Sequence, residues 1–129
     1  MKKVSLALAM IMLLSVFSLT ISNMSVHATG NNYTVSDMSF ENSSMHVGSD
    51  ESERNFIWHS DSSIGYVDYA VRNGNSFPAE YTSVQTRTSV FNGKTVHRAT
   101  IFGLENDTEY VYRFRSGNTV SQLKYFGTD

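Results

Sequence analysis

Residues 96–115 read VHRATIFGLENDTEYVYRFR, and this stretch decides the fold class. A β-rich run ends near Leu104, a polar corner follows, and Tyr110 begins a segment in which aromatic residues alternate with other side chains. Such alternation indicates a strand with one buried face. At a corner of this kind the tyrosine ring packs inside a β-sandwich, and its hydroxyl bonds to upstream backbone. We therefore predict that Leu104, Tyr110 and Tyr112 are structural residues.

The same pattern continues on both sides of this stretch. Short segments rich in β-branched and aromatic residues are separated by turn pairs such as Asn73-Gly74 and Asn92-Gly93. No apolar spacing typical of a helix persists over three turns, whereas residues 43–53 are polar and are predicted to form a loop. The sequence thus predicts an all-β, antiparallel, seven-stranded β-sandwich with Trp58 buried on an early strand. The predicted strands are residues 35–40, 54–59, 65–72, 81–90, 95–102, 109–115 and 120–126.

The first 28 residues have the layout of a secretory signal peptide. Lys2 and Lys3 precede an uncharged, mostly apolar run from Val4 to Ile21, and Ala28 is a small residue suited to a cut site. We expect cleavage after Ala28, which leaves residues 29–129 as one extracellular domain. The short Lys-Lys start is typical of a bacterial leader. An uncleaved membrane anchor is the alternative, because the apolar run is nearly long enough to span a bilayer.

The composition of residues 29–129 argues against several classes of function. Eight basic and twelve acidic residues give a formal charge of −4 with His neutral, without a basic tail that would bind nucleic acid. The sequence has no cysteine, which excludes disulfides, thiolate metal sites and a cysteine nucleophile. Arg113, Arg115 and Lys124 form the nearest thing to a basic cluster, and we predict that they are solvated surface residues.

Residues 96–113 resemble the closing half of the N-terminal domain of purple acid phosphatases, which is fibronectin type III-like. That half typically reads as a His pair or a His with a polar residue, a β run, Leu, a polar turn with Thr, and Tyr-x-Tyr. In this sequence Arg98 takes the place of the second His. The resemblance extends over about residues 33–129 and implies a fibronectin type III or immunoglobulin-like sandwich. Further similar pieces are Arg54-x-x-x-Trp58, Val67-x-Tyr69 and Phe126-x-Thr128.

In that family the domain precedes a metallophosphoesterase catalytic domain, which hydrolyses phosphomonoesters at a binuclear centre of iron with iron, zinc or manganese. The resemblance therefore implies such a catalytic domain as partner, and metals that belong to it. The sequence motifs of that catalytic domain include Gly-Asp and Gly-Asn-His. In this chain Gly74-Asn75 and Gly117-Asn118 are followed by Ser and Thr instead of His. We expect no catalytic, cofactor-binding or metal-binding residues in this chain. We also expect it to lack the catalytic domain, as a truncated or split phosphatase or as a free-standing module.

A histidine and a group of acidic residues are weaker candidates for function, and we predict a structural or solvated role for each. His97 falls within the run of family resemblance, and we predict a hydrogen-bonded structural histidine. Asp50, Glu51 and Glu53 lie near His46 in sequence, but they lack the spacing of a calcium loop and are predicted to be solvated.

A stand-alone extracellular fibronectin-type module that binds glycan or protein is the competing functional hypothesis. Exposed aromatic side chains would give such a module its binding platform. Ordinary packing is the alternative for these residues, because the sandwich needs most of its seven Phe and seven Tyr for its core. The candidates are Tyr66, Phe77, Tyr81, Phe91, Tyr125 and Phe126.

Overall fold

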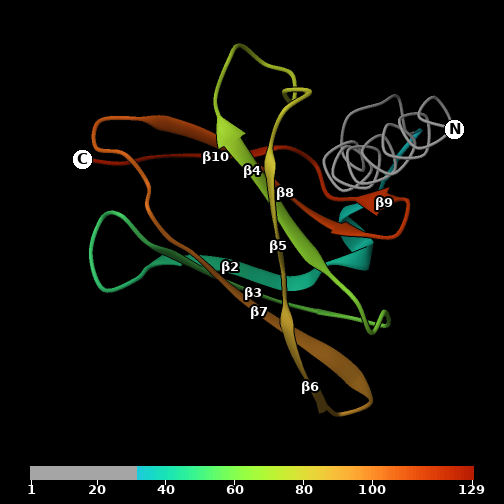
Figure 1. Cartoon of the computed structure of the whole chain (residues 1–129). Coiled ribbons are helices and arrows are strands. Elements are labelled where there is room, and N and C mark those ends of the chain that lie inside the picture. Colours follow the sequence, from blue (N-terminus) through green and yellow to red (C-terminus); the bar gives the residue numbers. More distant parts are fainter. Residues whose placement is uncertain (1–31) are drawn as a thin grey trace, which may run out of the picture. The chain divides into compact units, whose positions relative to one another are not determined.

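The computed structural model describes residues 32–129, which form two β-sheets (Figure 1). One sheet has the order β1-β9-β8-β4-β5, with β10 also pairing with β8, and the other has the order β2-β3-β7-β6. All strand pairs are antiparallel except β1 with β9. The strands are β1 (Thr34–Val35), β2 (Glu41–Val47), β3 (Arg54–Ser60), β4 (Tyr66–Val71), β5 (Thr82–Gln85), β6 (Arg87–Phe91), β7 (Lys94–Ile101), β8 (Glu109–Ser116), β9 (Thr119–Val120) and β10 (Lys124–Gly127).

This arrangement confirms the predicted all-β sandwich class. The predicted signal peptide and the cut after Ala28 lie outside the described residues. Within residues 32–129 the structure contains no helix of the length and apolarity that a membrane crossing requires.

The strand boundaries near the start of the described chain correct the prediction. Residues 35–40 are not one strand, because a 3₁₀ turn, η2 (Asp37–Ser39), follows β1. Residues 41–47, most of which fall within the predicted loop at 43–53, form β2 instead. This strand lies at the edge of its sheet and pairs with β3 alone. It can therefore form through backbone hydrogen bonds to β3 without the continuous apolar face that would reveal it in the sequence. A bulge between Glu41 and Ser44 further obscures its alternation.

Two predicted strands are each divided in two. The chain crosses from one sheet to the other at Thr86, so that residues 81–90 become β5, paired with β4, and β6, paired with β7. The last strand is interrupted between β9 and β10, where Ser121 bonds through its backbone N and its hydroxyl to the backbone of Phe114. The break at Thr86 is needed because one straight strand can pair in one sheet only, whereas β9 and β10 both pair with β8 in the same sheet.

The core lies between the sheets and is dominated by aromatic rings. Trp58 of β3 stacks on Phe114 of β8 at a centroid distance of 4.3 Å, and Phe56 packs against Tyr112 at 5.0 Å. Each of these four residues is buried. Burial of large aromatic side chains supplies most of the driving force that a domain without disulfides requires.

Candidate functional site

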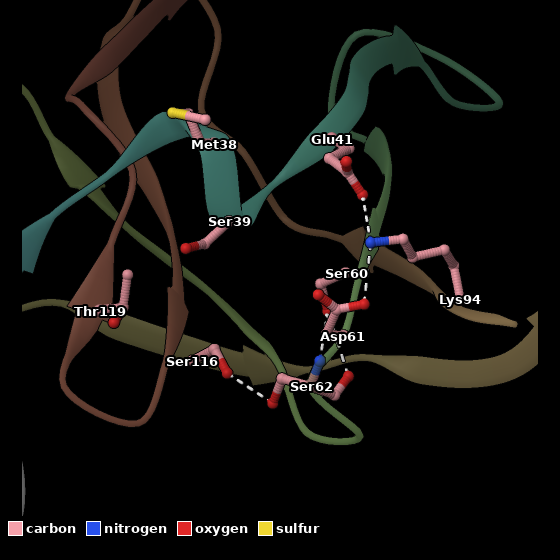
Figure 2. A pocket seen from close by; sticks show the side chains of 9 residues that line it. All are labelled: Met38, Ser39, Glu41, Ser60, Asp61, Ser62, Lys94, Ser116 and Thr119. Atoms are coloured by element: carbon pink, nitrogen blue, oxygen red, sulfur yellow. Dashed lines mark hydrogen bonds and ion pairs between the residues drawn. The ribbon is translucent and has the colours of Figure 1, made fainter.

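A polar pocket of about 260 Å³ opens where β3 and β8 end, and its hydroxyl, carboxylate and amine groups make it a place to look for chemistry (Figure 2). The sequence places hydroxyl groups here because short turns favour serine and threonine. The pocket is lined by Met38, Ser39, Glu41, Ser60, Asp61, Ser62, Lys94, Ser116 and Thr119.

The one cation of this pocket is held by two carboxylates. Lys94 Nζ lies 2.8 Å from Asp61 Oδ1 and 3.1 Å from Glu41 Oε2, as Figure 2 shows. Hydrogen bonds to Asp61 and then Glu41 raise the pKa of Lys94 above its ordinary value. Lys94 therefore stays protonated at neutral pH and is unsuited to act as a base or a nucleophile.

Behind the pocket wall, Ser60 forms a serine–histidine contact that resembles a catalytic dyad. Its hydroxyl lies 2.9 Å from Nε2 of His97, within the range expected for a nucleophile and its base. His97 itself is fully buried and stacks on Trp58 at 5.0 Å with an interplanar angle of 13°. The contact thus has the right distance, and its protonation state decides what it can do.

The hydrogen bonds of His97 assign its tautomer. Nε2 also lies 2.9 Å from the carbonyl oxygen of Ser62, which can only accept, so Nε2 carries the proton. Nδ1 lies 2.7 Å from Thr86 Oγ1 and accepts its hydrogen. Burial lowers the pKa of His97, which keeps the ring neutral. In this tautomer Ser60 faces a donor rather than a base, so the contact fixes the turn and does not activate the hydroxyl.

The residues predicted to be structural all lie in the interior. Trp58 is sandwiched between His97 and Phe114, and its Nε1 is the buried side-chain polar atom of residues 32–129 that has no hydrogen-bond partner. The hydroxyl of Tyr110 accepts a hydrogen bond of 2.8 Å from the backbone N of Glu105. Leu104 and Tyr112 are both 6% exposed, and burial raises the pKa of Tyr112.

A buried ion cluster is the main feature that sequence reasoning missed. Asp68 of β4 is fully buried, and its Oδ2 lies 3.0 Å from Arg113 Nε and 2.8 Å from Arg115 Nε. Ser83 donates a further hydrogen bond of 2.6 Å to Oδ1. The prediction that Arg113 and Arg115 are solvated is therefore wrong, because a carboxylate on the neighbouring strand holds them against the sheet.

Aromatic rings cover this ion cluster. The guanidinium of Arg113 lies 4.1 Å from the ring centroid of Phe77, 4.7 Å from Tyr33 and 5.2 Å from Tyr81. Arg115 lies 4.4 Å from the ring of Tyr66. These distances fit cation–π contacts. Three of the six candidate platform aromatics are therefore engaged in covering arginines.

The other platform candidates divide between core and surface. Phe126 is buried and stacks on Tyr110 at 5.2 Å. Tyr125 is 38% exposed and lies beside Arg72, whereas Phe91 is 62% exposed at the end of β6. The six residues do not form one continuous aromatic surface.

The acidic segment near His46 does not assemble a metal site. Asp50 accepts hydrogen bonds from Ser52, Glu51 pairs with Arg54 at 3.3 Å, and Glu53 accepts a bond from Ser49. Among residues 32–129 no three His, Cys, Asp or Glu side chains converge as metal ligands. The described residues thus do not fit the binuclear centre that the family resemblance implies for its catalytic domain.

Comparison with known proteins gives one family. The model of the family described as Purple acid Phosphatase, N-terminal domain, matches residues 40–128. No curated protein matches the chain.

Proposed function

The chain belongs to the family of purple acid phosphatase N-terminal domains, and on that premise we propose that it is the non-catalytic N-terminal domain of a secreted purple acid phosphatase-like metallophosphoesterase. The match over residues 40–128 carries this proposal, because it begins with the core residue Phe40 and contains every strand except β1. Phosphomonoester hydrolysis and metal binding then belong to a catalytic domain. That domain packs against this sandwich, and the sandwich shapes the access of substrate to the catalytic site.

The way in which the C-terminal segment is held supports this role. Arg54 donates a hydrogen bond of 3.3 Å to the carbonyl of Gly127, and its guanidinium lies 5.0 Å from the ring of Phe126. Thr128 and Thr108 exchange backbone and hydroxyl bonds, and the backbone N of Asp129 donates to Glu51. A catalytic domain joined after Asp129 would therefore leave the sandwich from a fixed position, as a partner that packs against it requires.

An activity assay of the purified chain tests the catalytic part of this proposal. We expect no hydrolysis of p-nitrophenyl phosphate with added iron, zinc or manganese, because the described residues provide no convergent ligands for a metal pair. Metal-dependent turnover that copurifies with the chain and is lost on adding a chelator would overturn it. The coding sequence beyond Asp129 is an independent test, since Gly-Asp and Gly-Asn-His blocks there would identify the catalytic partner.

Secretion and the competing binding-module hypothesis need their own measurements. N-terminal sequencing of protein from the culture medium is expected to begin at Thr29. On a glycan array the chain is expected to give no specific signal, because the exposed aromatics do not form a continuous platform. Specific glycan binding, together with unrelated coding sequence after Asp129, would favour the stand-alone module instead.

A further inference from the structure

A groove of about 310 Å³ on the outer face of the four-stranded sheet is the second hollow of interest. Its floor is Ile57, and the strand register places Arg98 beside Ile57 and Arg87 beside Arg98. In the next row His46, Asn55 and Thr100 lie side by side on β2, β3 and β7. The face belongs to a chain whose net charge is negative, yet none of the residues lining the groove is acidic.

The two arginines are opposed without any compensating charge. Arg87 and Arg98 are direct cross-strand partners, and like charges in that position destabilise a sheet. Among residues 32–129 neither guanidinium makes an ion pair, and Arg98 donates only one long hydrogen bond, of 3.4 Å, to Ser89 Oγ. This differs from Arg113 and Arg115, which share Asp68.

The remaining polar groups of the groove add donors. Thr100 donates to Oδ1 of Asn55 at 2.7 Å, so this bond does not use the NH₂ donor of Asn55. His46 stands opposite Asn55 and contributes a further ring nitrogen. Two planar guanidinium groups together with an amide donor match the oxygens of a tetrahedral oxyanion, because arginine binds phosphate through paired N–H groups.

We propose that this groove binds a phosphate group, either as free inorganic phosphate or as a phosphomonoester. The anion lies between the guanidinium groups of Arg87 and Arg98 and relieves their mutual repulsion, while Ile57 gives the floor an apolar surface. The proposal does not depend on the catalytic domain, because every group that it uses belongs to the sandwich.

The test is a titration of the purified protein with inorganic phosphate, phenyl phosphate and acetate, followed by amide NMR shifts. Saturable shifts are expected in β2, β3, β6 and β7 with both phosphates, and weaker ones with acetate. Shifts with inorganic phosphate alone identify free phosphate as the ligand. Arg87→Gln and Arg98→Gln are each expected to weaken binding about tenfold, the effect of losing one charge-assisted contact. Arg72→Gln, which removes an exposed arginine outside the groove, is the matched control and leaves binding unchanged.

Thermal unfolding without ligand separates a binding role from a structural one. Arg87→Gln is expected to leave the melting temperature unchanged or to raise it, because it removes a like-charge pair. The proposal is wrong if phosphate gives no saturable shifts, if acetate binds as tightly as phosphate, or if both arginine variants bind phosphate as the unmodified chain does.

Discussion

Removing the charge of Asp68 is expected to destabilise the domain more than any other single change in its polar residues. The variant Asp68→Asn keeps the shape of the side chain and leaves Arg113 and Arg115 without a counter-charge. Both guanidinium groups are close to full burial, with 9% and 13% of their side chains exposed, and the carboxylate is fully buried. Arg113 cannot return to water without detaching the aromatic cover formed by Tyr33, Phe77 and Tyr81, and Arg115 is covered in the same way by Tyr66.

The magnitude follows from the burial. Breaking a buried ion pair by removing one partner costs about 3–5 kcal/mol, because the remaining charge is left uncompensated. A domain of this size has a free energy of unfolding of about 5–15 kcal/mol, so Asp68→Asn is expected to remove a large share of that stability. Arg115→Met is expected to cost less, since Arg113 still neutralises Asp68 and the cluster changes from a formal charge of +1 to 0.

Urea unfolding followed by tryptophan fluorescence is the appropriate assay, because Trp58 is the single tryptophan and lies in the core. Asp68→Asn should lower the midpoint while leaving the slope unchanged. Asp61→Asn is the matched control. Its carboxylate lies at the same 2.8 Å from a cation, Lys94, but it is 85% exposed, so no measurable loss is expected. Equal effects of the two variants would refute the argument that burial sets the strength of these pairs.

Three further predictions follow from the core. Gly65→Ala places a methyl group 2.8 Å from His97 Nδ1 and from Trp58 Cζ2, and is expected to cost about 1–3 kcal/mol in urea unfolding; a neutral result would mean that the two stacked rings shift easily. Tyr110→Phe removes the acceptor for Glu105 N and should cost about 1 kcal/mol, whereas Tyr125→Phe, at an exposed site, should cost nothing measurable. Burial lowers the pKa of His97 below 6.5, so the unfolded chain binds the proton more readily and the free energy of unfolding should fall as pH drops below about 6.5. His97→Gln should flatten this pH dependence of stability between pH 7.5 and 5. An unchanged pH dependence in the variant would contradict the argument.

The sequence predicts those parts of the fold in which a local pattern and the tertiary structure agree. Tyr110 and Tyr112 of β8 lie in the core, as the alternation around them predicts. The expectation of only one buried face is wrong, because Val111 and Arg113 on the other face are buried as well. The polar run before Val47 lacks that signal, since an edge strand needs only backbone pairing with its neighbour. The break at Thr86 is equally hidden, because it follows from β5 and β6 pairing in different sheets, which no local pattern shows.

The candidate sites were harder to predict because the fate of an arginine depends on what the register places opposite it. Arg113 of β8 faces Asp68 of β4, so its charge is neutralised and it becomes part of the structure. Arg98 of β7 faces Arg87 of β6, so its charge stays available to a ligand. Both arginines look alike in the sequence, as polar residues within β-rich runs.

This difference in register predicts two separable effects in one set of proteins. Asp68→Asn should lower stability and, wherever the protein remains folded, leave phosphate affinity unchanged, because the ion cluster and the groove lie on different sheets. Arg98→Gln should do the reverse, weakening phosphate binding while stability is kept. If both variants changed stability and binding together, the two arginine sites would not be independent, and cross-strand register alone would not explain their different roles.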